Sequence, residues 1–274
     1  MKKVDRLGWT AGSAFKAYGV RIGVRTNSPQ VFSLLRERYP PRWKDSISPT
    51  VERLYSFLAG GPNRGPGLRR FNLLYRDAIR IGRTLDLEEA VELFESDLQL
   101  FVAEAARRRV FVHAGVVGWK GKAVVLPGYS YSGKTTLVVE LVKAGATYYS
   151  DEYAVLDEEG RVHPYPRALQ IRHSDSPRQE KYPVEALGGR AGKEPLPVGL
   201  VVVSRFSKDA KWHPRRLPAG RGMLELLANA VSVRRQPEVV MSTVRAAAAG
   251  ASIFKAARGE AKEVVDFILR QLGG

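Results

Sequence analysis

Residues 128–135 match the pattern G-x-x-x-x-G-K-T of phosphate-binding loops and read Gly128-Tyr129-Ser130-Tyr131-Ser132-Gly133-Lys134-Thr135. Residues 123–126 before the loop are typical of a short buried strand. Residues 136–144 behind it have a helical pattern that ends at Gly145, a common helix-terminating residue. Strand, loop and helix are the setting that this motif requires. We therefore expect residues 128–136 to bind the phosphates of a nucleotide.

The residue types of the loop explain the expected chemistry. Gly128 and Gly133 allow backbone N–H groups to turn inward toward an anion, and the start of the next helix adds its positive dipole end. Lys134 reaches the β- and γ-phosphates, and the Thr135 hydroxyl is a ligand for Mg²⁺. The sequence therefore predicts a site for ATP and Mg²⁺. The remaining contacts of the loop are assigned to Tyr129, Ser130, Tyr131, Ser132 and Thr136.

The composition indicates a folded chain. It has 274 residues, of which 44% are hydrophobic, so it can bury a substantial core. No run approaches the roughly 20 apolar residues of a membrane span, and no apolar segment follows the charges at residues 1–6. We expect a protein without a membrane span, located in the cytoplasm. The chain has no cysteine, which excludes disulfides and thiolate zinc sites, and its four histidines match no metal motif.

The formal net charge is +16, because 44 lysines and arginines outnumber 28 aspartates and glutamates. Such an excess is typical of nucleic-acid-binding proteins when the basic residues cluster on one face. Here the short basic groups at 107–109, 215–216 and 234–235 are scattered, and no nucleic-acid-binding motif accompanies them. The charge fits either a solvated basic surface or an acidic partner, and a nucleic-acid partner is not favoured.

Residues 1–107 have the pattern of a small α+β domain. Residues 18–26 alternate like a half-buried strand, and Ser28 predicts the N-cap of a helix over residues 29–39. Residues 73–81 predict two strands around a turn.

A long helix is expected to close this domain. Asp86 and Glu89 are spaced as in a capping box, and apolar residues follow at three- and four-residue spacing up to Ala105. We expect the helix to end on the three arginines at 107–109, whose charge suits the negative end of the helix dipole.

Residues 108–274 predict a second domain, with a mixed central sheet flanked by helices. Strands are expected at residues 110–119, 123–126, 146–150, 153–157, 162–172 and 200–204. Helices are expected at residues 136–144, 223–230, 237–250 and 260–272. The polar segment 174–197 predicts a lid or docking loop, with disorder as the equal alternative.

Asp151 and Glu152 follow the strand that comes after the loop helix, where phosphoryl transfer needs carboxylates. The alternative is an exposed turn with two ordinary surface acids. His113 lies at the corresponding end of an earlier strand, where it would tune a carboxylate or bond the transferred group, or else be a satisfied core histidine. We expect Asp151, Lys134, His113 and Glu152 to be catalytic.

In three segments the chain resembles the catalytic domain of HPr kinase/phosphorylase: His113-Ala114-Gly115, the loop from Gly128 to Thr136, and Ser150-Asp151-Glu152. That bacterial enzyme phosphorylates a seryl residue of a small phosphocarrier protein. Its fold holds a phosphate loop in a setting akin to phosphoenolpyruvate carboxykinase. The resemblance covers residues 108–172 and implies this P-loop fold for the second domain, with ATP and Mg²⁺ as cofactors.

The resemblance also implies roles for single residues. Lys134 and Thr135 would bind phosphate and Mg²⁺, and Asp151 would be the general base. Glu152 stands where the family has Asp and would complete the metal ligands Thr135, Asp151 and Glu152. The family's Glu-x-Arg-Gly segment corresponds to residues 170–173, which keep Arg172 for phosphate but place Gln170 at the acid. An amide is a weaker ligand for a hard cation, so the reverse phosphorylase direction stays open.

Together these features predict an ATP-dependent, Mg-assisted kinase that acts on a hydroxyl of a peptide or protein serine, and they do not favour a nucleic-acid partner. Arg167 and Arg172 are candidate phosphate clamps. The alternative is a nucleotide-binding regulator or scaffold with reduced or no kinase activity, which Glu152 and Gln170 favour. Family members often assemble as rings, so a homo-oligomer stays open, as do the acceptor and the choice of ATP, ADP or pyrophosphate as donor.

Overall fold

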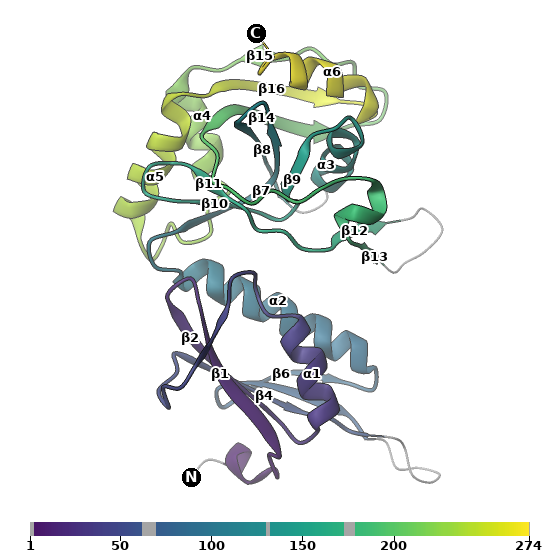
Figure 1. Ribbon diagram of the computed structural model, residues 1–274, viewed down its shortest axis with the longest axis vertical. Helices are drawn as coiled ribbons and strands as arrows, with labels where there is room; N and C mark the ends of the chain where they lie inside the picture. The colour runs from purple at the N-terminus through teal and green to yellow at the C-terminus, as the bar shows by residue number, and fades with distance from the viewer. Residues whose placement is uncertain (1–2, 62–69, 130–131, 173–178, 274) are drawn as a thin grey trace. The chain divides into compact units, whose positions relative to one another are not determined.

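The computed structural model describes residues 3–61, 70–129, 132–172 and 179–273. The chain divides into two compact units, Met1–Arg107 and Arg108–Gly274, which run from purple to blue and from teal to yellow in Figure 1. Each unit combines helices with a mixed β-sheet, which confirms the α/β class. Among the residues described, no helix has the length and apolar character needed to cross a bilayer.

The first unit contains a six-stranded sheet in the order β3-β1-β2-β4-β5-β6, preceded by a short 3-10 helix, η1 (Lys3–Arg6). Its strands are β1 (Ala11–Ala17), β2 (Val20–Thr26), β3 (Lys44–Ser46), β4 (Arg53–Leu58), β5 (Asn72–Arg76) and β6 (Ile79–Thr84). β2 and β4 are parallel, and the other neighbours are antiparallel. The predicted strands at 18–26 and 73–81 correspond to β2 and to the β5–β6 hairpin, whereas β1, β3 and β4 were not predicted.

Two helices, α1 (Pro29–Glu37) and α2 (Leu87–Ala105), pack on this sheet. Both begin at the predicted caps, because the side chains of Ser28 and Asp86 accept N–H groups of the first turn. The prediction that α2 ends on residues 107–109 is wrong. The helix stops before them and has no basic residue in its last turn.

The second unit contains an eight-stranded sheet in the order β11-β10-β7-β8-β14-β16-β15, with β9 also paired to β7. Its strands are β7 (Val110–Trp119), β8 (Lys122–Pro127), β9 (Thr147–Ser150), β10 (Tyr153–Leu156), β11 (Val162–His163), β14 (Val198–Phe206), β15 (Arg215–Arg216) and β16 (Ser252–Arg258). β8, β14 and β16 are parallel and the other pairs are antiparallel, so the sheet is mixed as predicted. β15 and β16 were not predicted.

Helices cover both faces of this sheet (Figure 1). α3 (Lys134–Lys143) and α6 (Lys262–Arg270) share one core cluster with Val124 of β8. α4 (Ala219–Leu227) and α5 (Pro237–Ala249) share the other cluster with Val125. Adjacent residues of β8 therefore face opposite helical layers, which explains why its sequence is continuously apolar.

β7 changes partners along its length. Its first part, up to His113, pairs with β10, and its second part, from Ala114, pairs with β8 on one side and β9 on the other. The carbonyl oxygen of Glu152, between β9 and β10, accepts the N–H of Ala114 at 3.1 Å. The loop that follows β8 and the turn that joins β9 to β10 are thus both attached to the middle of β7.

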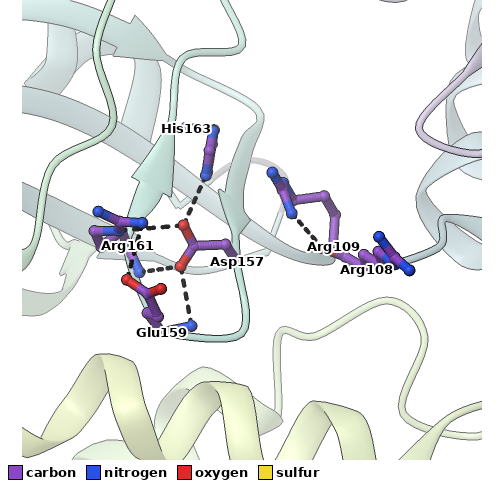
Figure 2. Close-up of polar contacts among 6 residues, drawn as sticks. All are labelled: Arg108, Arg109, Asp157, Glu159, Arg161 and His163. Atoms are coloured by element: carbon purple, nitrogen blue, oxygen red, sulfur yellow. Dashed lines mark hydrogen bonds and ion pairs between the residues drawn. The ribbon is translucent and has the colours of Figure 1, made fainter.

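A tight turn joins β10 to β11 (Figure 2). The carboxylate of Asp157 accepts the backbone N–H groups of Glu159 and Arg161 at 3.1 and 2.9 Å, and it lies 2.8 Å from a ring nitrogen of His163. The expected turn is confirmed. The expected return strand over residues 162–172 is wrong in extent, because β11 ends at His163.

The polar segment after β11 is more ordered than predicted. β12 (Leu169–Arg172) pairs with β13 (Gln179–Tyr182) as a separate antiparallel hairpin, and a 3-10 helix, η2 (Val184–Leu187), follows. Residues 174–197 were expected to be a lid or docking loop or to be disordered, and this is wrong for residues 179–187, which form β13 and η2. Residues 174–178 lie outside the described residues.

Candidate functional site

The loop between β8 and α3 starts and ends with glycine. The N–H of Gly128 donates to the carbonyl oxygen of His113 at 3.2 Å, which attaches the start of the loop to β7. Gly133 has a φ of +86°, and a Cβ there would lie 2.5 Å from a guanidinium nitrogen of Arg258. A side chain at this position would therefore be disfavoured both by the backbone conformation and by the contact with Arg258. α3 begins at the next residue, Lys134, so strand, loop and helix follow one another in the expected order.

Several donors surround the loop. The Lys134 ammonium donates to the carbonyl oxygen of Tyr129 at 2.6 Å, so this side chain bends back over the loop. Burial lowers the pKa of Lys134, and the carboxylates of Asp151 and Glu152 oppose that shift. The Ser132 hydroxyl is buried and has no hydrogen-bond partner among the described residues. A helix start, an ammonium group and an unsatisfied hydroxyl together suit an anion with several oxygens.

A serine side chain shapes the turn that carries the two predicted acids. The hydroxyl of Ser150, buried at the end of β9, accepts the N–H groups of Glu152 and Tyr153 at 3.1 and 3.0 Å. These bonds turn the chain between β9 and β10 and leave Asp151 and Glu152 partly buried. The acids are therefore held by local hydrogen bonds, and the exposed-turn alternative does not describe them.

Asp151 contacts the first turn of α3. Its Oδ2 accepts the Thr135 hydroxyl at 3.3 Å, and its Oδ1 accepts the Tyr148 hydroxyl at 2.9 Å. Burial raises the pKa of Asp151 above the usual range of a carboxyl group, although the Tyr148 hydroxyl, the charge of Arg167 and the Thr135 hydroxyl act in the opposite direction. A raised pKa makes the ionised carboxylate a stronger proton acceptor.

Glu152 forms an ion pair with Arg167, whose side chain is only 15% exposed. The carbonyl oxygen of Arg167 lies 3.0 Å from the Tyr148 hydroxyl, so its backbone is fixed next to Asp151. The guanidinium thus brings a positive charge close to both acids.

His113 is partly buried beside Tyr153, with ring centroids 4.8 Å apart. Burial lowers the pKa of the imidazole, and the positive charge of Lys134 lowers it further. The ring is therefore mainly neutral at pH 7. It can exchange hydrogen bonds with a phosphate or a hydroxyl, but it does not supply a fixed positive charge.

A cavity of about 670 Å³ joins these groups. The predicted site residues that line it are His113, Gly133, Lys134, Thr135, Thr136, Asp151 and Glu152. Arg167 and Gln170 also line it. Gly128, Tyr129 and Ser132 belong to the loop but not to the cavity wall. Ser130 and Tyr131 lie outside the described residues, and Arg172 is described only as backbone of β12.

The predicted Mg²⁺ ligands are Thr135, Asp151 and Glu152. The first two place a hydroxyl and a carboxylate oxygen 3.3 Å apart, which fits a cation that prefers oxygen ligands. Glu152 is the weaker candidate because Arg167 binds its carboxylate. Over the described ranges, no three His, Asp or Glu side chains are grouped as a metal site. Mg²⁺ held by one or two carboxylates is commonly completed by phosphate oxygens and water, so the pair fits this ion.

Two residues beside the site were not predicted. Tyr148 lies on β9, where an aromatic residue is typical of a core position, and only the fold brings its hydroxyl to Asp151. Arg258 donates to the carbonyl oxygen of Gly133 at 2.7 Å from 125 residues further along the chain. The sequence of its strand, Ser252–Arg258, does not alternate regularly between apolar and polar residues, so no simple pattern marks it as a strand.

Neither a scan against protein-family models nor a search of curated proteins finds a match to this chain. The resemblance of residues 108–172 to HPr kinases therefore stays an expectation from the sequence motifs.

Proposed function

We propose that this chain is an ATP-dependent, Mg-assisted phosphotransferase related to HPr serine kinases, which transfers the γ-phosphate to a hydroxyl of a peptide or protein serine. The observation that carries the proposal is the contact between Asp151, whose pKa burial raises, and Thr135 in the first turn of α3. A proton acceptor and a phosphate loop then share one cavity. In this proposal residues 108–274 are a P-loop catalytic domain and residues 1–107 a separate N-terminal domain, in the cytoplasm.

The phosphates would bind at the start of α3. The N–H groups of residues 133–136 have no partner one turn earlier in the helix, and they add to the positive end of its dipole. The Lys134 ammonium lies within reach of the same loop. Transfer develops negative charge on the departing phosphate oxygens, so these donors stabilise the transition state more than the ground state.

Asp151 would act on the acceptor. As the acceptor oxygen bonds to the γ-phosphorus, the bond from phosphorus to the bridging oxygen of ADP breaks, and Asp151 takes the hydroxyl proton. Neutral His113 would hydrogen-bond the transferred group. Arg167, held by Glu152, and Arg172 would bind phosphate oxygens.

Thr135 and Asp151 are the residues that would hold Mg²⁺, with Glu152 as a weaker candidate. When bound, Mg²⁺ would neutralise negative charge on the phosphates.

The net charge of +16 favours an acidic acceptor. Exposed lysines and arginines attract an acidic peptide over roughly one Debye length, about 8 Å at physiological ionic strength. We therefore expect binding of the acceptor to weaken as salt is raised.

The test is transfer of γ-labelled phosphate from Mg-ATP to the components of a cell lysate. We expect a labelled product with the parent chain and none with Asp151→Asn, while both bind ATP by calorimetry. Asp266→Asn is the matched control, since Asp266 is an exposed carboxylate on α6, and it should label like the parent. Equal labelling by Asp151→Asn would contradict the role of Asp151.

A second function, a nucleotide-binding regulator without transfer, is favoured by one observation. Gln170 lines the cavity at the position where the resemblance places an acid. In that case ATP and ADP bind, no phosphate moves, and replacing Asp151 changes neither result. Partner binding that depends on the nucleotide would then be the activity to measure.

A further inference from the structure

Arg258 is a buried cation directly behind the phosphate loop. It is the last residue of β16 and only 2% exposed, and it heads the largest fully buried side chains of the described residues. Its guanidinium donates to the carbonyl oxygens of Gly133 at 2.7 Å and Gly259 at 3.0 Å. It does not line the cavity, so it would act on a bound anion through the loop and through its charge.

The first consequence concerns the peptide bond between Gly133 and Lys134. In a trans peptide the C=O and the next N–H point in opposite directions. The Gly133 carbonyl accepts Arg258 at 2.7 Å and also the N–H of Leu137 at 3.2 Å, so both bonds keep the N–H of Lys134 pointing away from Arg258. The backbone of Phe206, on the neighbouring strand β14, binds the loop in the same way, since its N–H donates to the Ser132 carbonyl at 3.2 Å. The ends of β14 and β16 thus orient two successive carbonyls of the loop.

The second consequence concerns charge. No aspartate or glutamate of the described residues lies within ion-pair distance of Arg258, and its Nε has no hydrogen-bond partner there. Burial disfavours its charged form, and nearby Glu260 compensates only in part, so that the pKa of Arg258 is lowered. A buried charge without a counter-ion destabilises the fold. An anion at the start of α3 would offset that cost.

We infer that Arg258 is a positioning residue for polyphosphate binding. It orients the N–H of Lys134 toward the inside of the loop, and the polyphosphate of the ligand serves as the counter-ion of its guanidinium. The inference rests on the proposed function only in requiring that the loop bind a nucleotide or pyrophosphate. It does not require phosphate transfer.

A purely structural role for Arg258 makes a different prediction. If its hydrogen bonds only tie β16 to the loop, replacing it lowers the stability of the ligand-free chain, and affinity falls as a result. If the charge of Arg258 is balanced only when an anionic ligand is bound, replacing Arg258 with an apolar residue of similar length removes an unbalanced buried charge. The ligand-free chain then stays at least as stable, while ligand affinity falls.

The experiment measures binding of Mg-ATP and of inorganic pyrophosphate by calorimetry, together with the melting temperature of the ligand-free chain. The variants are Arg258→Met and Arg258→Lys, and the control is Arg205→Met, which removes an exposed arginine from β14. We expect Arg258→Met to bind both ligands about 10- to 100-fold more weakly, the scale of losing one charge-assisted interaction. It should melt no lower than the parent, Arg258→Lys should recover part of the affinity, and Arg205→Met should bind like the parent.

Other outcomes would overturn the inference. Unchanged affinity in Arg258→Met would do so, as would a melting temperature that falls in step with affinity and returns with it in Arg258→Lys. If Arg258→Met fails to fold, its role is structural and the inference is wrong. Failure of the proposed function is a separate result: ATP binding that depends on Arg258 without any labelled product would reject the kinase and keep the inference. A parent chain that binds neither ligand would reject both.

Discussion

Asp151 precedes and Asp157 follows the four-residue strand β10, yet their surroundings shift their pKa values in opposite directions. Burial raises the pKa of Asp151 and outweighs its hydrogen bonds. Burial also disfavours the charge of Asp157, but the hydrogen bonds from His163 and the backbone of Arg161 outweigh it and lower the pKa (Figure 2). The balance between burial and hydrogen-bond donors therefore separates the two carboxylates: burial prevails at Asp151, and the donors prevail at Asp157.

The largest expected difference between the two aspartates is in catalysis. Asp151→Asn should lower the rate of phosphate transfer by about 100-fold or more, because the acceptor loses its general base. Asp157→Asn should leave the rate per folded molecule close to that of the parent, since Asp157 does not line the cavity. Initial rates of label incorporation, normalised to folded protein, measure both. Equal losses of transfer rate in the two variants would show that Asp151 has no special role in catalysis.

In stability the order should reverse. Asp157→Asn should lower the free energy of unfolding by about 1–3 kcal/mol, because buried His163 and two partly buried N–H groups of the β10–β11 turn lose a charged acceptor. Asp151→Asn should be at least as stable as the parent at pH 7, since its ionised form is disfavoured by burial. Urea unfolding at pH 7 gives both values. A less stable Asp151→Asn would show that its hydrogen bonds outweigh its burial.

The pH dependence of transfer should reflect the raised pKa of Asp151. The rate should rise with pH through a midpoint above about 3.9, the usual value for Asp, because the base must be ionised. Tyr148→Phe should move the midpoint further up, since the Tyr148 hydroxyl stabilises the ionised form. Rates across the acidic range, for parent and variant, provide the measurement. If the midpoint is the same in Tyr148→Phe, the rise of the rate with pH reflects the ionisation of a group other than Asp151.

The acid sensitivity of folding should reflect Asp157 instead. Its folded pKa is lowered, so its contribution to stability is present above the unfolded value of about 3.9 and is lost as pH falls through the folded value. The melting temperature of the parent should thus drop more in acid than that of Asp157→Asn. Parallel curves for the two chains would argue against this linkage.

The smallest expected effect is that of Ser150→Ala. It removes the acceptor of two backbone N–H groups in the turn before β10, at a cost of about 0.5–1.5 kcal/mol for each bond that water does not replace. Because the turn carries Asp151, transfer should fall while ATP affinity stays nearly constant. Thermal melts and calorimetry test this, and a large loss of ATP affinity would place the turn in nucleotide binding.

Structural features that depend on residues close together in the sequence were predictable. The helix caps Ser28 and Asp86 accept N–H groups within one turn of the chain. The strand β8 is recognisable because burial of both its faces makes its sequence continuously apolar. β3 could not be predicted in this way, since Lys44–Ser46 is a short polar edge strand that pairing with β1 defines. The polar composition of residues 179–187 suggested a loop, but pairing of β13 with β12 overrides it.

The candidate site divides similarly. Lys134, Thr135 and Asp151 were predictable because their motifs are short and follow strands in order. Tyr148 and Arg258 were not, because their roles depend on contacts with Asp151 and Gly133 that only the folded sheet creates. Gln170 was expected near the acids and lines the same cavity.

The change of partners within β7 limits where this chain can tolerate a change in length. An extra residue beside His113 would turn the side chains of one half of β7 to the opposite face and separate the loop that begins at Gly128 from the turn that carries Asp151 and Glu152. At the far end of β7 the turn through Gly121 faces open space, where an added Cβ would meet nothing within 4 Å. Insertions that arise in related chains should therefore accumulate at the Gly121 turn and be absent around His113.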